Sequence, residues 1–419
     1  VMSNIFEIKD GELFFDGVEL QTVAKKFGTP CYIYSKNLIE KNFNGYREHL
    51  SSENNFICYA VKANPNVAIL QILAELGSGF DITSQGELNR VLYAGGDPKK
   101  IIFSGVGKSE SDIKKGLDAK IKCFNVESKY ELLLINRIAK TSDIKASISI
   151  RVNPNVDANT HPYIATGLKN DKFGVDMREA HGIFKLASEL SNIEIMGIAC
   201  HIGSQIYDIA PFRESLQILM HFVDKLKLDN IHLSHIDIGG GLGTLKEDTN
   251  QTNIKEFSKT IMNDCSGRTE KIIIEPGRSI VGNAGVLLMK TEYVKTNGEK
   301  NFAIVDAGMN DYLRPALYQA EMEIKSVSPN SAQSKIYDIV GPVCESGDFL
   351  GKDRELPIET GDLLCLCDAG AYGFTMSSNY NSRCRPTEIL IVGASLHVIR
   401  ERETFEDLIK NEKLIEYIN

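Results

Sequence analysis

Eight short apolar segments alternate with helical patterns between residues 56 and 275. Segments 67–77 and 178–191 are examples of the intervening helical patterns, and Gly77 is a suitable C-cap for the first. Strands that are apolar along their whole length indicate a parallel sheet buried on both faces. Eight such units predict a (β/α)8 barrel, with a doubly wound open sheet as the alternative. The expected strands occupy 56–60, 79–82, 101–104, 121–125, 146–152, 193–201, 233–238 and 271–275.

The sequence pattern changes after residue 282. Short β-branched runs follow one another between turn residues, and no long amphipathic helix interrupts them. This pattern predicts a second, all-β domain. The first 35 residues also have the pattern of strands, and we expect them to join this domain. The sequence therefore predicts a barrel at 36–282 and a β-domain built from 1–35 and 283–419.

The composition argues against several classes of partner. The net charge of −9 disfavours nucleic acid and anionic membrane surfaces. No apolar run is long enough to span a bilayer, and we expect no signal peptide at the N-terminus. Nine scattered cysteines fit free thiols in a reducing, cytoplasmic compartment. Cys365 and Cys367 lack the spacing of a metal or redox motif, and we expect no metal site.

Residues capable of chemistry follow six of the eight expected strands. The active sites of parallel barrels form at the carboxyl ends of the strands, and a phosphate often binds after strands seven and eight. This arrangement therefore favours an enzyme over a structural protein. The residues are Lys62, Asp81, Arg151, His201, the glycine cluster 239–243, and Glu275 with its neighbours Gly277 and Arg278.

Lys62 directly follows the first strand, within CYAVKANPN. Its ammonium would lie in the barrel mouth, where a buried charge costs free energy unless it is paired or deprotonated. A deprotonated lysine is a nucleophile that forms a Schiff base with an aldehyde. An isolated lysine would more often extend to solvent. The other polar residues at the same end of the barrel favour catalysis here.

Three other features have both a structural and a functional interpretation. The glycine cluster GGGLG is either a simple turn or a loop whose N–H groups hold a phosphate, and it lacks the spacing of a dinucleotide site. Glu275 either pairs with Arg278 or holds a proton on a pyridine nitrogen. His201 is either a core histidine or a residue that stacks on a cofactor ring.

Eight motifs, in order along nearly the whole chain, resemble the diaminopimelate decarboxylase family of alanine-racemase-like (fold type III) pyridoxal phosphate enzymes. They are AVKANPN, FDITSQGEL, RVNPN, HIGSQ, GGGLG, EPGR, CESGD and DAGAYG. The segment 157–175 resembles the diaminopimelate branch rather than its ornithine and arginine relatives. The resemblance implies decarboxylation of meso-2,6-diaminopimelate to L-lysine and CO2, the last step of lysine biosynthesis, by a homodimer with shared active sites.

The resemblance also implies roles for individual residues. Lys62 carries pyridoxal 5'-phosphate, with Asp81 beside it, His201 on the ring and Glu275 at the ring nitrogen. The phosphate contacts Ser204, the Gly240 region, Gly277 and Tyr372, and Arg278 is a further cofactor contact. On the substrate, Arg278, Arg314 and Tyr318 hold the distal carboxylate, Glu345 binds the distal ammonium and Cys344 donates a proton. Tyr372 is a further substrate contact.

The chemistry of the substrate agrees with these roles. Arginine suits a carboxylate because its guanidinium binds both oxygens, whereas a carboxylate such as Glu345 suits an ammonium. A thiol such as Cys344 is a suitable acid for the carbanion that remains when CO2 leaves.

Three alternatives remain open at this stage. The first is a related decarboxylase of ornithine, arginine or carboxynorspermidine, against which the pair Arg278 and Arg314 argues. The second is a racemase, which Glu275 disfavours because it would keep the ring nitrogen protonated. The third is a non-catalytic pyridoxal phosphate-binding homologue, which would tend to lack Lys62 or Cys344.

Overall fold

The computed structural model describes residues 5–50, 55–158, 160–162, 166–167, 172–244 and 252–416. The chain divides into two compact units. One unit comprises Ile39–Val281, and the other combines Val1–Leu38 with Gly282–Asn419. Within the described residues, no helix is both long and apolar enough to cross a membrane.

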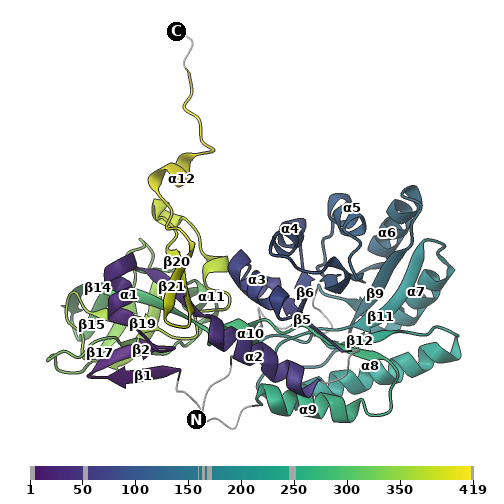
Figure 1. Ribbon diagram of the computed structural model, residues 1–419, viewed down its shortest axis with the longest axis horizontal. Coiled ribbons are helices and arrows are strands. Elements are labelled where there is room, and N and C mark those ends of the chain that lie inside the picture. The colour runs from purple at the N-terminus through teal and green to yellow at the C-terminus, as the bar shows by residue number, and fades with distance from the viewer. Residues whose placement is uncertain are drawn as a thin grey trace. The chain divides into compact units, whose positions relative to one another are not determined.

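The first unit is a closed barrel of eight parallel strands surrounded by helices (Figure 1). Each strand pairs with the next along the chain, and β13 returns to β5 to close the ring. A short strand, β10 (Val175–Asp176), extends the sheet beside β9. The barrel strands are β5 (Phe56–Ala60), β6 (Gly79–Ile82), β7 (Ile101–Phe103), β8 (Cys123–Val126), β9 (Ala146–Asn153), β11 (Ile193–Ala199), β12 (His235–Asp237) and β13 (Lys271–Ile274). The predicted (β/α)8 fold is therefore confirmed.

Several helices of this unit begin where the sequence provides a side chain to cap them. Ser84, Ser109 and Ser128 each accept a hydrogen bond from a backbone N–H in the first turn of the following helix. Such caps satisfy N–H groups that have no partner within the helix. The helices are α2 (Lys36–His49), α3 (Val67–Glu75), α4 (Gln85–Tyr93), α5 (Glu110–Asp118), α6 (Lys129–Thr141), α7 (Met177–Glu189), α8 (Ala210–Leu228), α9 (Ile254–Asp264) and α10 (Arg278–Val281).

Apolar side chains fill the lower part of the barrel interior. Cys58, Ile102, Cys123 and Ile273 form one buried cluster, and Phe56 packs against it. This layer is a solid core, so polar side chains that are two residues further along the same strands lie above it. The barrel therefore presents its chemistry at the carboxyl ends of its strands.

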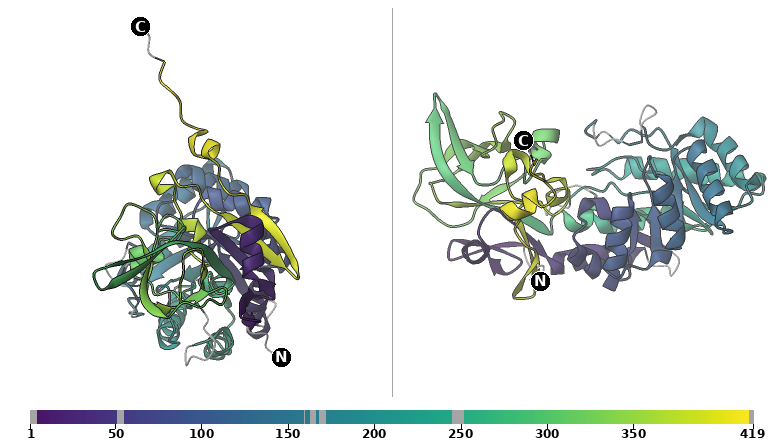
Figure 2. Two further views of the ribbon diagram at one scale, coloured as in Figure 1. Left: turned by 90° about the vertical axis from the view of Figure 1, so that its left-hand side faces the viewer. Right: turned by 90° about the horizontal axis from the view of Figure 1, so that it is seen from above.

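The second unit is rich in β-structure and combines the beginning of the chain with its last third (Figure 2). In the larger sheet β14 pairs with β4, β15 and β19, so the N-terminal strand β4 lies within a C-terminal sheet. Two of its strand pairs, β4 with β20 and β15 with β17, are parallel. The strands are β1 (Phe6–Lys9), β2 (Glu12–Phe15), β3 (Val18–Glu19), β4 (Cys31–Ser35), β14 (Gly285–Asn297), β15 (Lys300–Val305), β16 (Ile324–Ser326), β17 (Lys335–Val340), β18 (Phe349–Leu356), β19 (Leu363–Leu366), β20 (Thr387–Val392) and β21 (Ser395–Arg400).

Two local predictions were wrong in detail. The first 35 residues contain a helix, α1 (Leu20–Phe27), which buries Leu20 and Val23 and has two lysines in its last turn. The helix α3 has Leu76 as its C-cap, and Gly77 follows it with a φ of +84°. Gly77 thus occupies the position after the cap, where a left-handed backbone favours glycine. The second unit has two other short helices, α11 (Arg314–Tyr318) and α12 (Phe405–Ile409).

Candidate active site

Lys62 lies in a tight turn, η1 (Val61–Ala63), between strand β5 and helix α3. The turn is stabilised by Asn64, which accepts the N–H of Asn66, and by Asn66, which caps α3. The Nζ atom of Lys62 is 3.3 Å from Oδ2 of Asp81, on the neighbouring strand β6. Asp81 is fully buried, whereas the Lys62 side chain keeps 36% of its surface exposed. The amine is therefore held at the mouth of the barrel by an ion pair.

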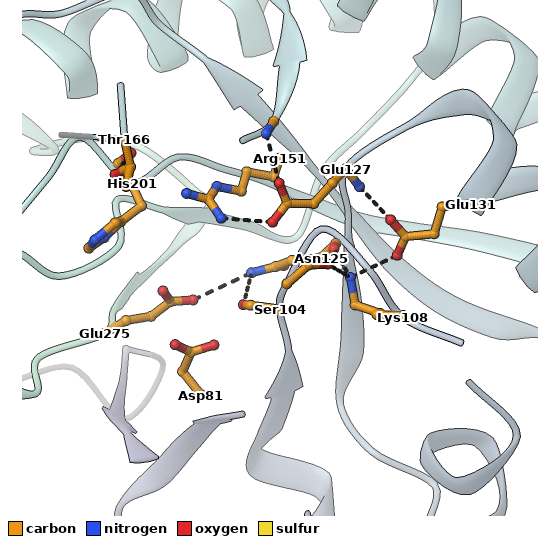
Figure 3. Close-up of polar contacts among 12 residues, drawn as sticks. Asp81, Ser104, Lys108, Asn125, Glu127, Glu131, Arg151, Thr166, His201 and Glu275 are labelled. Carbon is orange, nitrogen blue, oxygen red and sulfur yellow. Dashed lines mark hydrogen bonds and ion pairs between the residues drawn. The ribbon is translucent and has the colours of Figure 1, made fainter. Parts of the chain in front are cut away.

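Glu275 lies directly after β13 and is almost fully buried beside other carboxyl groups. Its Oε1 accepts a 3.4 Å hydrogen bond from the amide of Asn125, which also bonds Ser104 (Figure 3). Burial raises the pKa of Glu275 well above its usual range, and the neighbouring carboxylates of Asp237 and Asp81 raise it further. A positive charge that enters the barrel mouth beside this carboxyl would therefore favour its ionised form.

His201 follows β11, and its ring is held by the glycine turn. The backbone N–H of Gly240 donates to Nδ1 of His201 at 3.1 Å. Burial, and then the positive charges of Lys62 and Arg151, lower the pKa of His201 well below its usual range. His201 is consequently a neutral imidazole whose proton resides on Nε2, because Nδ1 acts as an acceptor.

The glycine turn leaves no room for side chains. A Cβ atom at Gly240 would lie 2.1 Å from the carbonyl oxygen of Glu275, and one at Gly241 would lie 2.5 Å from that of Gly203. Backbone hydrogen bonds join this turn to the loop after β11 through Ile206. The hydroxyl of Ser204, on that loop, accepts hydrogen bonds from the Arg278 guanidinium at 3.2–3.3 Å. The sequence motifs HIGSQ, GGGLG and EPGR thus meet at one end of the barrel.

A buried ionic network, which the sequence analysis missed apart from Arg151, supports these residues (Figure 3). Lys108 donates to Glu131 and to the carbonyl oxygen of Asn125, both at 2.7 Å. Glu131 accepts the N–H of Glu127, and Glu127 binds Arg151 at 2.7 Å. Glu127 directly follows β8, so its place after a barrel strand was the available signal.

The remaining predicted site residues lie in the second unit. Arg314 begins α11, is nearly fully buried, and its guanidinium lies 5.1 Å from the ring centre of Tyr318. Cys344 is an exposed thiol in the loop after β17, and its N–H donates to the Asn381 side chain.

Glu345 accepts a hydrogen bond from the Tyr380 hydroxyl in the same unit. Tyr372 lies in a turn after β19 with a φ of +54°. The distinctive segment 157–175 lies partly outside the described residues.

The chain is similar to known proteins over almost its whole length. Residues 36–282 match the profile described as "Pyridoxal-dependent decarboxylase, pyridoxal binding domain". The chain is 49% identical to the diaminopimelate decarboxylase of Pseudomonas aeruginosa, over 98% of this chain and 99% of that protein. The chain belongs to the diaminopimelate decarboxylase family.

Solved structures of the diaminopimelate decarboxylase family share the architecture of both units. The Helicobacter pylori enzyme, determined in complex with L-lysine, is 43% identical, with a TM-score of 0.90 over 94% of this chain and 99% of that chain. The Methanocaldococcus jannaschii enzyme is 40% identical, with a TM-score of 0.93 over 98% of each chain.

The residues at the barrel mouth fit the pyridoxal cofactor of the family. Among the described residues, Asp81 Oδ1 and Asn125 Oδ1 are buried acceptors with no hydrogen-bond partner. Asp81 is paired with an amine, Lys62, that can bond to an aldehyde. The turn at Gly240 and the hydroxyl of Ser204 form a small polar cradle of the kind that binds phosphate.

Proposed function

We propose that this chain catalyses the decarboxylation of meso-2,6-diaminopimelate to L-lysine and CO2, the last step of lysine biosynthesis, with pyridoxal 5'-phosphate as cofactor. The observation that carries the proposal is the ion pair of Lys62 and Asp81 at the barrel mouth, in the same cluster as the buried carboxyl of Glu275. A lysine for covalent attachment and a carboxyl for the ring nitrogen are the two groups that such a cofactor requires. Pyridoxal phosphate, when bound, stabilises the electron pair left on the substrate carbon as CO2 departs.

The barrel residues would hold the cofactor in a defined orientation. Lys62 would attach it through its amine, and Glu275 would keep a proton on the ring nitrogen. His201 is neutral and fixed by Gly240, so it can pack against an aromatic ring without adding charge. Ser204 and the glycine turn would bind the phosphate, together with Gly277, Arg278 and Tyr372.

The specificity for a substrate with two amino acid centres would come from both units. We infer that Arg278 and Arg314, with Tyr318 and Tyr372, bind the distal carboxylate. Glu345 would bind the distal ammonium, and Cys344 would donate the proton that replaces CO2. The exposed thiol of Cys344 and the buried guanidinium of Arg314 are compatible with these roles.

The assembly and location of the enzyme are further parts of the proposal. We infer a cytoplasmic homodimer in which Cys344 and Glu345 complete the active site of the partner subunit. In this arrangement residues 36–282 bind the cofactor, and the β-rich remainder provides substrate and dimer contacts.

A product assay tests the proposed reaction. Purified protein supplied with cofactor and meso-diaminopimelate should release CO2 and L-lysine in equal amounts, and Lys62→Ala should release neither. CO2 without lysine would indicate another substrate chemistry, and no CO2 from the cofactor-loaded wild type would contradict the proposal.

A further inference from the structure

Asp237 is the last residue of β12 and is completely buried inside the barrel. Its Oδ1 accepts the backbone N–H of Gly239 at 2.8 Å. Its Oδ2 has no hydrogen-bond partner among the residues that the structure describes, and the Glu275 carboxyl and the Asn125 amide both lie beside the Asp237 carboxyl. Two carboxyl groups that face each other in this way can form a hydrogen bond only if one of them carries a proton.

Gly239 connects Asp237 to both residues that would face the cofactor ring. The N–H of Gly239 binds Asp237, and its carbonyl oxygen accepts the N–H of Glu275 at 2.8 Å. The next N–H, from Gly240, donates to His201. Gly239 has a φ of +71°, and a Cβ atom there would lie 2.5 Å from a carbonyl oxygen, so the turn has little freedom to adapt. The Asp237 carboxyl thus stabilises the turn that positions Glu275 and His201.

The charges around Asp237 oppose its ionisation. Asp81 and Glu275 are both buried nearby, and Lys62 is already paired with Asp81. Burial raises the pKa of both Asp237 and Glu275. Further titratable groups near Asp237 are the thiols of Cys58 on β5, Cys123 on β8 and Cys200 directly after β11. Two adjacent buried carboxylates without a cation of their own retain one proton between them.

We propose that Asp237 is a positioning residue that shares one proton with Glu275 and holds this proton when Glu275 faces a positively charged ring nitrogen. As a neutral acid, Asp237 accepts from Gly239 through one oxygen and donates to Glu275 through the other. This inference deepens the proposed function, since it rests on Glu275 facing the cofactor.

Two substitutions at Asp237 distinguish a protonated side chain, which donates a hydrogen bond to Glu275, from an ionised one. Asp237→Asn keeps the acceptor for Gly239 and provides an N–H donor for Glu275, as protonated aspartate does. Asp237→Leu has a similar size and neither group. The dissociation constants of the wild type and of Asp237→Asn for pyridoxal phosphate should agree within about threefold. The Asp237→Leu variant should bind the cofactor about 10- to 100-fold more weakly, because it loses a hydrogen bond to a charged group. Asp81→Asn is the matched control, because it removes a buried carboxylate that is paired with Lys62, and it should weaken binding.

Infrared difference spectra provide a readout that does not depend on activity or on the Leu variant folding. The protonated carboxyl band of the cofactor-loaded wild type should be reduced in Asp237→Asn. The difference between the two proteins is required, because burial also raises the pKa of Asp311 to about 7 and its band would overlap.

Each outcome supports or overturns the inference. An Asn variant that binds cofactor as poorly as Leu would show that Asp237 acts as an anion, and a Leu variant that binds like wild type would exclude a positioning role. Unchanged infrared spectra in the Asn variant would also overturn the shared proton. Failure of the proposed function is distinguishable, because it would appear as no lysine formed from diaminopimelate by a wild type that still binds cofactor.

Discussion

The amine of Lys62 and the carboxylate of Asp81 lie 3.3 Å apart on neighbouring strands of the barrel, and Asp81 has no solvent exposure. Lys62 is the only lysine of the predicted site, and the ion pair holds it just beyond the end of a barrel strand. A covalently attached cofactor would be bonded to Nζ of Lys62, and Asp81 holds this atom in place.

Lys62 should be the single point of cofactor attachment. The purified protein should be yellow, and borohydride should fix the cofactor permanently to the peptide that contains Lys62. Lys62→Arg retains a positive charge for Asp81 but cannot bond to the aldehyde, so it should lose at least about a thousandfold in kcat, like Lys62→Ala. Label on another lysine, such as the buried Lys108, would refute this assignment.

Lys108 should be essential for the stability of the barrel. Its side chain is 1% exposed, and its Nζ donates to Glu131 at 2.7 Å. Lys108→Met leaves the buried Glu131 without its ion-pair partner, which should cost about 3–5 kcal/mol of unfolding free energy. Lys114→Met, on the exposed face of α5, is the control and should change stability by less than about 0.5 kcal/mol. Urea denaturation measures both, and equal effects would contradict the role of the network.

The stability of the second unit should depend on the ionisation of Asp311. Burial raises the pKa of this carboxyl to about 7, compared with about 4 in an unfolded chain. Between these values the folded state binds a proton that the unfolded state does not, so stability falls as the pH rises from about 4 to 7. Asp311→Asn retains an acceptor for the N–H of Gly308 and removes the titration.

Thermal denaturation between pH 5 and pH 8 tests this dependence. The free energy of unfolding of Asp311→Asn should exceed that of the wild type by an amount that grows with pH and reaches about 1–3 kcal/mol. This is less than the full pKa shift implies, because the loop can relax. The exposed Glu401→Gln should show no such trend. A difference between Asp311→Asn and wild type that is independent of pH would contradict the raised pKa.

Much of the fold could be predicted because the eight barrel strands are continuous apolar runs with helices between them. All eight expected strands are present, with ends shifted by up to two residues. Helix α1 was missed because the β-branched and aromatic residues before it suggested strands throughout. Its amphipathic pattern spans only about two turns, which is too short to be distinctive.

The candidate site was only partly predictable. Residues just beyond a strand, such as Lys62 and Glu275, stand out because they interrupt an apolar run. Asn125 and Asp237 lie within strands, and a single polar residue there does not reveal which neighbours it faces. Lys108 lies in the loop after β7 and Glu131 in the helix after β8, so their ion pair depends on the pairing of these two strands.

Mixed dimers test whether Lys62 of one subunit and Cys344 of its partner serve the same active site. Homodimers of Lys62→Ala and of Cys344→Ala should both be inactive. Random exchange of equal amounts would make about half of the dimers mixed, each with one intact site, so CO2 release should recover to about a quarter of wild type. Mixed dimers that form and remain inactive would show that Cys344 does not serve the partner's site.

The most direct test of the proposed function is the ratio of kcat/KM for meso-diaminopimelate to that for ornithine, measured by CO2 release with cofactor present. Ornithine lacks the distal carboxylate and would leave Arg278 and Arg314 without their ligand. Such a loss costs roughly 2–5 kcal/mol, so the ratio should be about 30 to 5,000. A ratio near one would contradict the recognition of diaminopimelate by these arginines.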